Sequence, residues 1–168
     1  DTIVVFYKSD STWKGFEYPA TTDPGTYYLK NPMNVDGTAI LIPGQYAYKI
    51  GLHQGKYKAL VQRGKVDVLR DYDRNATLDF LNGKKYSGFF GINIHRANPS
   101  GLSANVDKWS AGCQVFADST DFNHFLDLVD NSVDLYGNDS IYYVLVDNRS
   151  VSRAKKRNIT FFFNFVRN

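Results

Sequence analysis

One cysteine and one nearby histidine are the residues of this sequence best suited to covalent chemistry. The segment "KWSAGCQVF" contains Cys113, the single cysteine among 168 residues. A free thiol is only roughly 3% ionised at pH 7, so a nucleophilic cysteine needs a base or a cation beside it. The segment "GFFGINIH" ends at His95, 18 positions before Cys113. We therefore predict a dyad in which His95 lowers the pKa of the Cys113 thiol below about 8.5.

The residues before the cysteine are small. Ser110, Ala111 and Gly112 form a tight approach to Cys113. A glycine at this place would let a substrate carbonyl come close to the main chain, and the amides of Gly112 and Cys113 would then form an oxyanion hole. The alternative is structural, because free cysteines are commonly small buried hydrophobes.

The other two histidines are weaker candidates. His53 adjoins the Gln54-Gly55 turn, and His124 lies within an amphipathic segment, so we expect both near the surface. A zinc site normally takes three or four Cys, His or carboxylate ligands. With one cysteine and one histidine at this spacing, the sequence does not predict zinc.

The elements that must hold these residues are mostly strands. Alternating apolar and polar residues, rich in aromatic and β-branched types, predict a mainly β (α+β) domain spanning 1–168. The predicted strands are 2–8, 38–42, 45–51, 57–62, 65–70, 88–95, 113–116, 141–147 and 159–166.

Two of these strands are joined in a hairpin, and one helix follows the cysteine. The Gln54-Gly55 turn joins the strands on either side of it. A helix is expected after Asp118, capped by a residue in 119–121, because the apolar residues that follow recur at helical spacing.

The dyad is expected where a strand ends and a loop begins. In the strand 88–95, side chains alternate, so Asn93 and His95 share the polar face. The segment 98–109 is rich in Asn, Pro, Ser and Gly and is predicted to be an exposed loop. It connects His95 to the Cys113 segment.

This order of residues resembles the catalytic signature of the L,D-transpeptidase family. A strand ending in His95, a loop, and then Ser110-x-Gly112-Cys113 running into a strand and a helix match that signature. The segment "PGQYAYKIGLHQGKYKALVQ" also resembles the hairpin at the start of the family's sheet. The resemblance covers roughly residues 38–147.

The resemblance implies a mixed β-sandwich and a cysteine acyl-transfer enzyme acting on peptidoglycan stem peptides. Cys113 would be the nucleophile and His95 its base, with Gly112 and Ser110 shaping the site and no cofactor required. Transpeptidase, L,D-carboxypeptidase and L,D-endopeptidase activities all fit. The implied location is the cell envelope, the periplasm, outside the cell, or a virion.

Three positions depart from the family pattern. The family usually has Gly or Ser after the histidine, His before the motif glycine, and Arg or Asn two places after the cysteine. Here these positions hold Arg96, Ala111 and Val115. Arg96, or Gln114 next to the cysteine, would then supply the polar contacts to substrate.

Two rival functions stay open. A catalytically inactive wall-binding or phage structural module would keep the fold and tolerate the departures. An unrelated cysteine amidase or protease would share only the cysteine and the histidine.

The segment "RDYDRNATLDF" is a partial calcium motif. Asp71, Asp73, Asn75 and Asp79 occupy positions 1, 3, 5 and 9 of a calcium-loop pattern, but position 6 is not Gly and position 12 is not Glu. A structural calcium ion is one hypothesis. A solvated turn with side-chain-to-backbone hydrogen bonds explains the same residues.

The amino-acid composition restricts the kinds of binding partner to expect. The net charge is +3 and the basic residues are dispersed, so nucleic acid is not the expected partner. No apolar run is long enough for a membrane span, and a single cysteine forms no intrachain disulfide. Because the sequence begins at Asp1, we expect a processed chain or a part of a longer protein.

Overall fold

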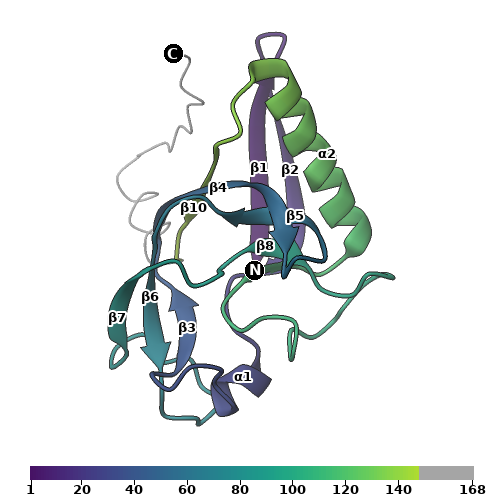
Figure 1. Cartoon of the computed structure of the whole chain (residues 1–168). Coiled ribbons are helices and arrows are strands. Elements are labelled where there is room, and N and C mark those ends of the chain that lie inside the picture. Colours follow the sequence, from purple (N-terminus) through teal and green to yellow (C-terminus); the bar gives the residue numbers. More distant parts are fainter. Residues whose placement is uncertain (148–168) are drawn as a thin grey trace, which may run out of the picture.

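The computed structural model describes residues 1–147, which form two antiparallel-rich sheets and one long helix (Figure 1). The larger sheet has the order β1-β2-β9-β8-β5-β4-β10, and the smaller has the order β3-β6-β7. The elements are β1 (Thr2–Ser9), β2 (Thr12–Thr21), α1 (Thr26–Lys30), β3 (Thr38–Leu41), β4 (Gly44–His53), β5 (Tyr57–Gln62), β6 (Val66–Asp71), β7 (Lys84–Gly88), β8 (Ile94–Arg96), β9 (Gln114–Phe116), α2 (Ser119–Tyr136) and β10 (Ile141–Leu145).

The mainly β prediction is confirmed. Strands β1, β3, β4, β5, β6, β9 and β10 lie within one to two residues of their predicted limits, and the Gln54-Gly55 turn closes an antiparallel hairpin with His53 opposite Tyr57. Three elements, β2, α1 and β7, were not predicted. The predicted strand 159–166 lies outside the described residues.

The predicted strand 88–95 is wrong, because the chain leaves the sheet between β7 and β8. Gly91 has a φ of +71°, a left-handed conformation that interrupts a strand. The main-chain amides of Phe90 and Ile92 both donate to the side-chain oxygen of Gln62, at 3.0 and 2.8 Å. One half-buried glutamine thus replaces the ladder bonds that a continuous strand would have made.

Two short central strands position the dyad. β8 and β9 pair in parallel, with His95 opposite Val115, whereas every other strand pair in both sheets is antiparallel. A parallel pair requires a crossover between its strands, and the loop 97–113 provides it. The starts of β8 and β9 therefore lie side by side, although a long loop separates the two strands in sequence.

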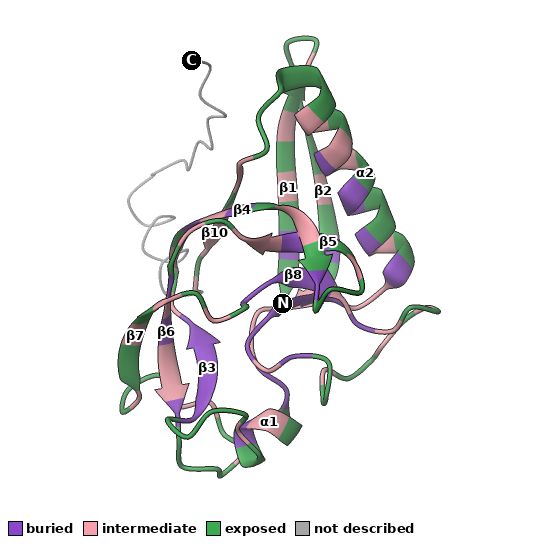
Figure 2. Ribbon diagram, viewed as in Figure 1, coloured by how far each residue is buried: buried purple, intermediate pink, exposed green. Residues whose placement is uncertain are grey.

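The helix α2 packs its apolar face on the β1–β2 hairpin side of the sheet (Figures 1 and 2). Its buried apolar residues are Phe122, Phe125, Leu126 and Val129, at the predicted helical spacing. The cap is Asp118, one residue earlier than predicted, whose carboxylate accepts a hydrogen bond from Thr120 N. Gly137, at a φ of +64°, ends the helix.

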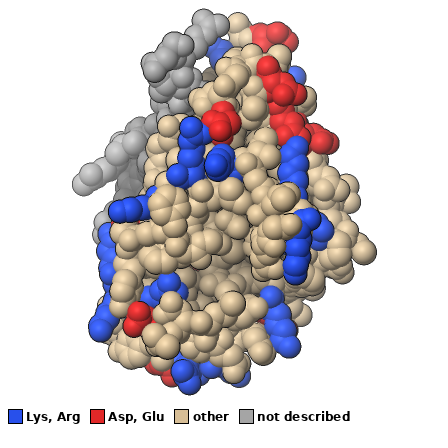
Figure 3. Space-filling view, viewed as in Figure 1, with Lys and Arg blue, Asp and Glu red and all other residues tan. Residues whose placement is uncertain are grey.

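The surface in Figure 3 shows Lys and Arg dispersed around a shallow centre, while acidic residues gather over α2. This face has no single basic patch of the kind that binds nucleic acid. Within residues 1–147, no helix has both the length and the apolar character needed to cross a bilayer.

Candidate active site

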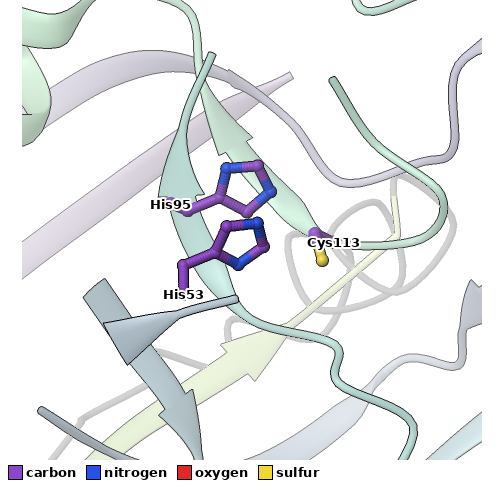
Figure 4. A group of neighbouring side chains, drawn as sticks. All are labelled: His53, His95 and Cys113. Atoms are coloured by element: carbon purple, nitrogen blue, oxygen red, sulfur yellow. The ribbon is translucent and has the colours of Figure 1, made fainter. Parts of the chain in front are cut away.

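Three side chains from separate parts of the fold meet beside the β8–β9 pair. His53 comes from the end of β4, His95 from β8, and Cys113 from the residue before β9 (Figure 4). One nitrogen of each histidine and the Cys113 sulfur all lie within 4.8 Å of one another. Their exposed fractions are 8%, 2% and 9% respectively. The predicted dyad is therefore brought together, with a second histidine added.

The hydrogen bonds of His95 determine which of its nitrogens is available. His95 Nδ1 lies 2.7 Å from the carbonyl oxygen of Arg96 and 3.1 Å from the hydroxyl of Tyr57. A carbonyl only accepts, so Nδ1 carries the proton and donates to Arg96 O. The lone pair is then on Nε2. His95 is thus a neutral imidazole that can accept a proton on Nε2, the nitrogen that does not bond to the Arg96 carbonyl.

His53 was wrongly expected near the surface. Its ring stacks on that of His95, with centroids 3.9 Å apart and planes 22° apart. The Asn93 side-chain amide donates to His53 Nδ1 at 3.1 Å. No periodic signal marks position 53, because only the tertiary pairing of Leu60 in β5 with Ile94 in β8 brings the hairpin beside His95. His124, by contrast, is exposed, as predicted.

Burial favours the neutral forms of all three groups. Desolvation, with a smaller contribution from the neighbouring His53, lowers the pKa of His95 to about 4. Desolvation likewise lowers the pKa of His53. It raises the pKa of the Cys113 thiol to about 11, although the amide of Asn93 opposes this. The expected lowering of the thiol pKa is therefore wrong for the resting protein.

The Cys113 thiol is held by main-chain groups. Its Sγ donates to the carbonyl of Gly91 at 3.3 Å and accepts from the amide of Asn93 at 3.4 Å. The first bond stabilises the protonated thiol, and the second stabilises a thiolate. The bond to the exposed Gly91 must break before the sulfur can attack a substrate.

Gly112 and Ser110 have structural roles that sequence reasoning did not assign. Gly112 has a φ of +126°, and a Cβ there would lie 2.5 Å from the carbonyl oxygen of Ala39. The close approach is thus made by β3 and not by a substrate. The Gly112 amide donates to Ser110 Oγ at 3.1 Å, and Ser110 Oγ donates to the Cys113 carbonyl at 2.8 Å. Of the two amides predicted for the oxyanion hole, that of Gly112 is engaged, whereas that of Cys113 has no hydrogen-bond partner within residues 1–147.

Gln114 and Arg96, the two residues proposed for polar contacts to substrate, differ in exposure. Gln114 is fully buried and joins Tyr143, whose hydroxyl donates to it at 2.8 Å, to the Thr22 carbonyl at 3.3 Å. Gln114 therefore connects β9 to β10 and to the residue that follows β2, which is a structural role. The guanidinium of Arg96 lies 4.3 Å from the centre of the Tyr57 ring and is partly exposed. Arg96 remains the candidate for contact with an anionic group.

A cavity of about 200 Å³ lies between the β2–β9 pair and the crossover loop. Its lining includes Ala97 and Val115, which also pack on Cys113, together with the loop residues 103–106. Cys113 itself does not line it. His95 does not line it either, so Ala97 and Val115 separate the cavity from the dyad.

The calcium-motif residues are engaged in a network of turns. Asp73 accepts from Asn75 N, Asn75 from Thr77 N, and Asp79 from Leu81 N and Asn82 N. Asp71 is buried at the end of β6, and its Oδ2 accepts from Asp79 N at 3.0 Å. Within residues 1–147, the one group of three or more His, Cys, Asp or Glu side chains close enough to share a metal is His53, His95 and Cys113. These side-chain-to-backbone hydrogen bonds are the ones expected of a solvated turn, and a structural calcium ion stays a prediction.

Comparisons with known proteins return nothing for this chain. No protein-family model, no curated protein and no solved structure matches it. The inference of function therefore depends on the residues of the site.

Proposed function

We propose that this protein is a cysteine acyl-transfer enzyme that acts on peptidoglycan stem peptides, as an L,D-transpeptidase, L,D-carboxypeptidase or L,D-endopeptidase. The observation that supports it most is the meeting of His95 and Cys113, with His95 Nδ1 anchored on the Arg96 carbonyl. This anchoring leaves Nε2 unprotonated and available as a general base, which is the arrangement that activates a nucleophile.

The neutral resting pair determines how the reaction proceeds. With a thiol pKa of about 11 and a histidine pKa of about 4, a thiolate–imidazolium pair is strongly disfavoured before substrate binds. Proton transfer then accompanies attack. The S–H bond of Cys113 breaks, its proton passes to His95 Nε2, and Sγ bonds to the carbonyl carbon of the third stem residue.

Collapse of the tetrahedral intermediate completes acylation. The C–N bond to the following D-residue breaks, and His95 returns its proton to the departing amine. The Cys113 amide is the donor available for the oxyanion. The thioester then passes to an amine, which gives transpeptidation, or to water, which gives hydrolysis.

The test uses disaccharide tetrapeptides. Wild-type protein should convert them to tripeptides, or to exchanged products when an amine is supplied. Cys113→Ala should reduce turnover on the order of 10⁴-fold, because the covalent route is lost. His124→Gln, an exposed histidine on α2, is the matched control and should retain full turnover. Products are followed by mass spectrometry.

A second candidate is a non-catalytic wall-binding or phage structural module. The burial of Cys113 and its bond to Gly91 favour it, since a thiol held in this way is inert at rest. Under this alternative, wild type and Cys113→Ala would leave tetrapeptides intact and would sediment equally with purified sacculi. That result would refute the proposed enzyme.

A further inference from the structure

We infer that His53, His95 and Cys113 form a site for a borderline-soft divalent cation, with Zn²⁺ as the best fit, and that the cation blocks the nucleophile when bound. The three residues supply two imidazole nitrogens and one sulfur from β4, β8 and the start of β9. Histidine nitrogens and cysteine thiolates are the usual zinc ligands, and three protein ligands leave the fourth tetrahedral position open.

The separations suit a tetrahedral ion. Zinc–nitrogen bonds of about 2.0–2.1 Å and a zinc–sulfur bond of about 2.3 Å place the ligand atoms of a tetrahedron roughly 3.3–3.6 Å apart. The three atoms already lie within 4.8 Å of one another. An inward movement on the order of 1 Å completes the site.

The outer contacts of the histidines are those of metal ligands. A ligating histidine usually donates its other ring N–H to a carbonyl or a carboxylate, which fixes the tautomer. His95 does this through Nδ1 to Arg96 O, which leaves Nε2 for the ion. His53 contacts the Asn93 side chain through Nδ1. A half-turn of that amide presents its oxygen, so that Nδ1 takes the proton and Nε2 is released.

Binding requires the two histidine rings to tilt and the hairpin turn beside His53 to shift. The rings of His53 and His95 are now stacked with planes 22° apart, and they must tilt to direct both lone pairs at one ion. The position of His53 helps, because it is the last residue of β4 and the next three residues, 54–56, are exposed hairpin turn. A shift there moves the ring without disturbing the core strands.

The binding step changes no oxidation state. The S–H bond of Cys113 breaks, its proton leaves to solvent, and a sulfur lone pair bonds to the cation. The bond from the thiol to Gly91 is given up at the same time. A metal-bound sulfur cannot attack a carbonyl, so cation and stem peptide exclude each other. This inhibition depends on the proposed function, whereas the metal site itself does not.

The experiment uses Co²⁺ as a spectroscopic substitute for Zn²⁺, added alone to the folded, reductant-free protein. The expected result is one equivalent bound, with a thiolate-to-cobalt charge-transfer band and the intense visible bands of tetrahedral cobalt. Zn²⁺ should displace it and remove both. Cys113→Ser should abolish the charge-transfer band, and His53→Gln should weaken binding at least about tenfold, since losing a ligand costs no less than losing an outer-shell partner.

Controls separate this inference from the proposed function. His124→Gln should bind Co²⁺ as wild type does, and thermal melting of each variant confirms that it is folded. Absence of the charge-transfer band in wild type, or full affinity in folded His53→Gln, overturns the metal site. If chelator-treated protein fails to turn over tetrapeptides but still binds Co²⁺ through Cys113, the acyl-transfer proposal fails and the metal site stands.

Discussion

The titration of Cys113 provides the most direct test of how its environment controls reactivity. Burial places the thiol pKa at about 11, with the amide of Asn93 as the one opposing influence. At pH 7 the ionised fraction then falls from roughly 3% for a free thiol to about 0.01%, a roughly 300-fold loss of the reactive form. Because the thiolate is the nucleophile, alkylation of the folded protein should slow by at least that factor.

The assay is alkylation by iodoacetamide over a range of pH. The single cysteine makes the label site unambiguous, and the same protein in denaturant supplies the free-thiol reference. The position of the pH profile is the informative quantity, because limited access lowers the rate equally at every pH. We expect the native rate to be still rising at pH 10, whereas the denatured protein levels off above about 8.5.

A native midpoint at or below about 8.5 would refute this reasoning. It would mean that His95 and Cys113 already form a thiolate–imidazolium pair at rest. The neutral resting pair used in the proposed mechanism would then be wrong, and the sequence-based expectation of a lowered thiol pKa would be restored.

Two further predictions concern the surrounding structure. Gly112→Ala should destabilise the fold by more than the roughly 1–3 kcal/mol of a left-handed non-glycine residue, because its Cβ would also meet Ala39 O at 2.5 Å. Gly101→Ala, at the same φ of +126° but with open space around it, is the control, and equal denaturation midpoints for the two variants would remove the steric argument. For the turn at Asp73, Asn75 and Asp79, we expect the same melting temperature in millimolar calcium chloride as in sodium chloride of equal ionic strength. A rise specific to calcium would instead support the calcium hypothesis.

Local sequence signals were sufficient where the structure depends on neighbouring residues. The Gln54-Gly55 turn determined a hairpin whose register follows from turn geometry. The helix after Asp118 was visible because its apolar residues recur at helical spacing. In β2, Gly15 and Pro19 weaken the strand pattern, and pairing with β1 on one side and β9 on the other overrides them.

The sequence predicted only part of the candidate site, because local signals do not show which distant residues the fold brings together. His95 and Cys113 could be paired because the type of each residue and a short motif suggested one chemistry. His53 lies more than 40 positions before His95 in the sequence, and only the pairing of β5 with β8 brings the two rings into contact. The sign of the thiol pKa shift was also missed, because desolvation depends on the whole surrounding core.

The central place of β9 in the sheet has a consequence for how the chain folds. This three-residue strand joins β2 through the pairing of Ala20 with Phe116 and joins β8 in parallel, so it connects the N-terminal hairpin to the rest of the sheet. Contacts this remote in sequence form slowly, because the entropy of closing the intervening loop is lost before they stabilise the chain. The β1–β2 and β4–β5 hairpins can form early, but Cys113 becomes shielded only when β9 docks between them. Protection of that one thiol during refolding therefore reports the closing step of assembly.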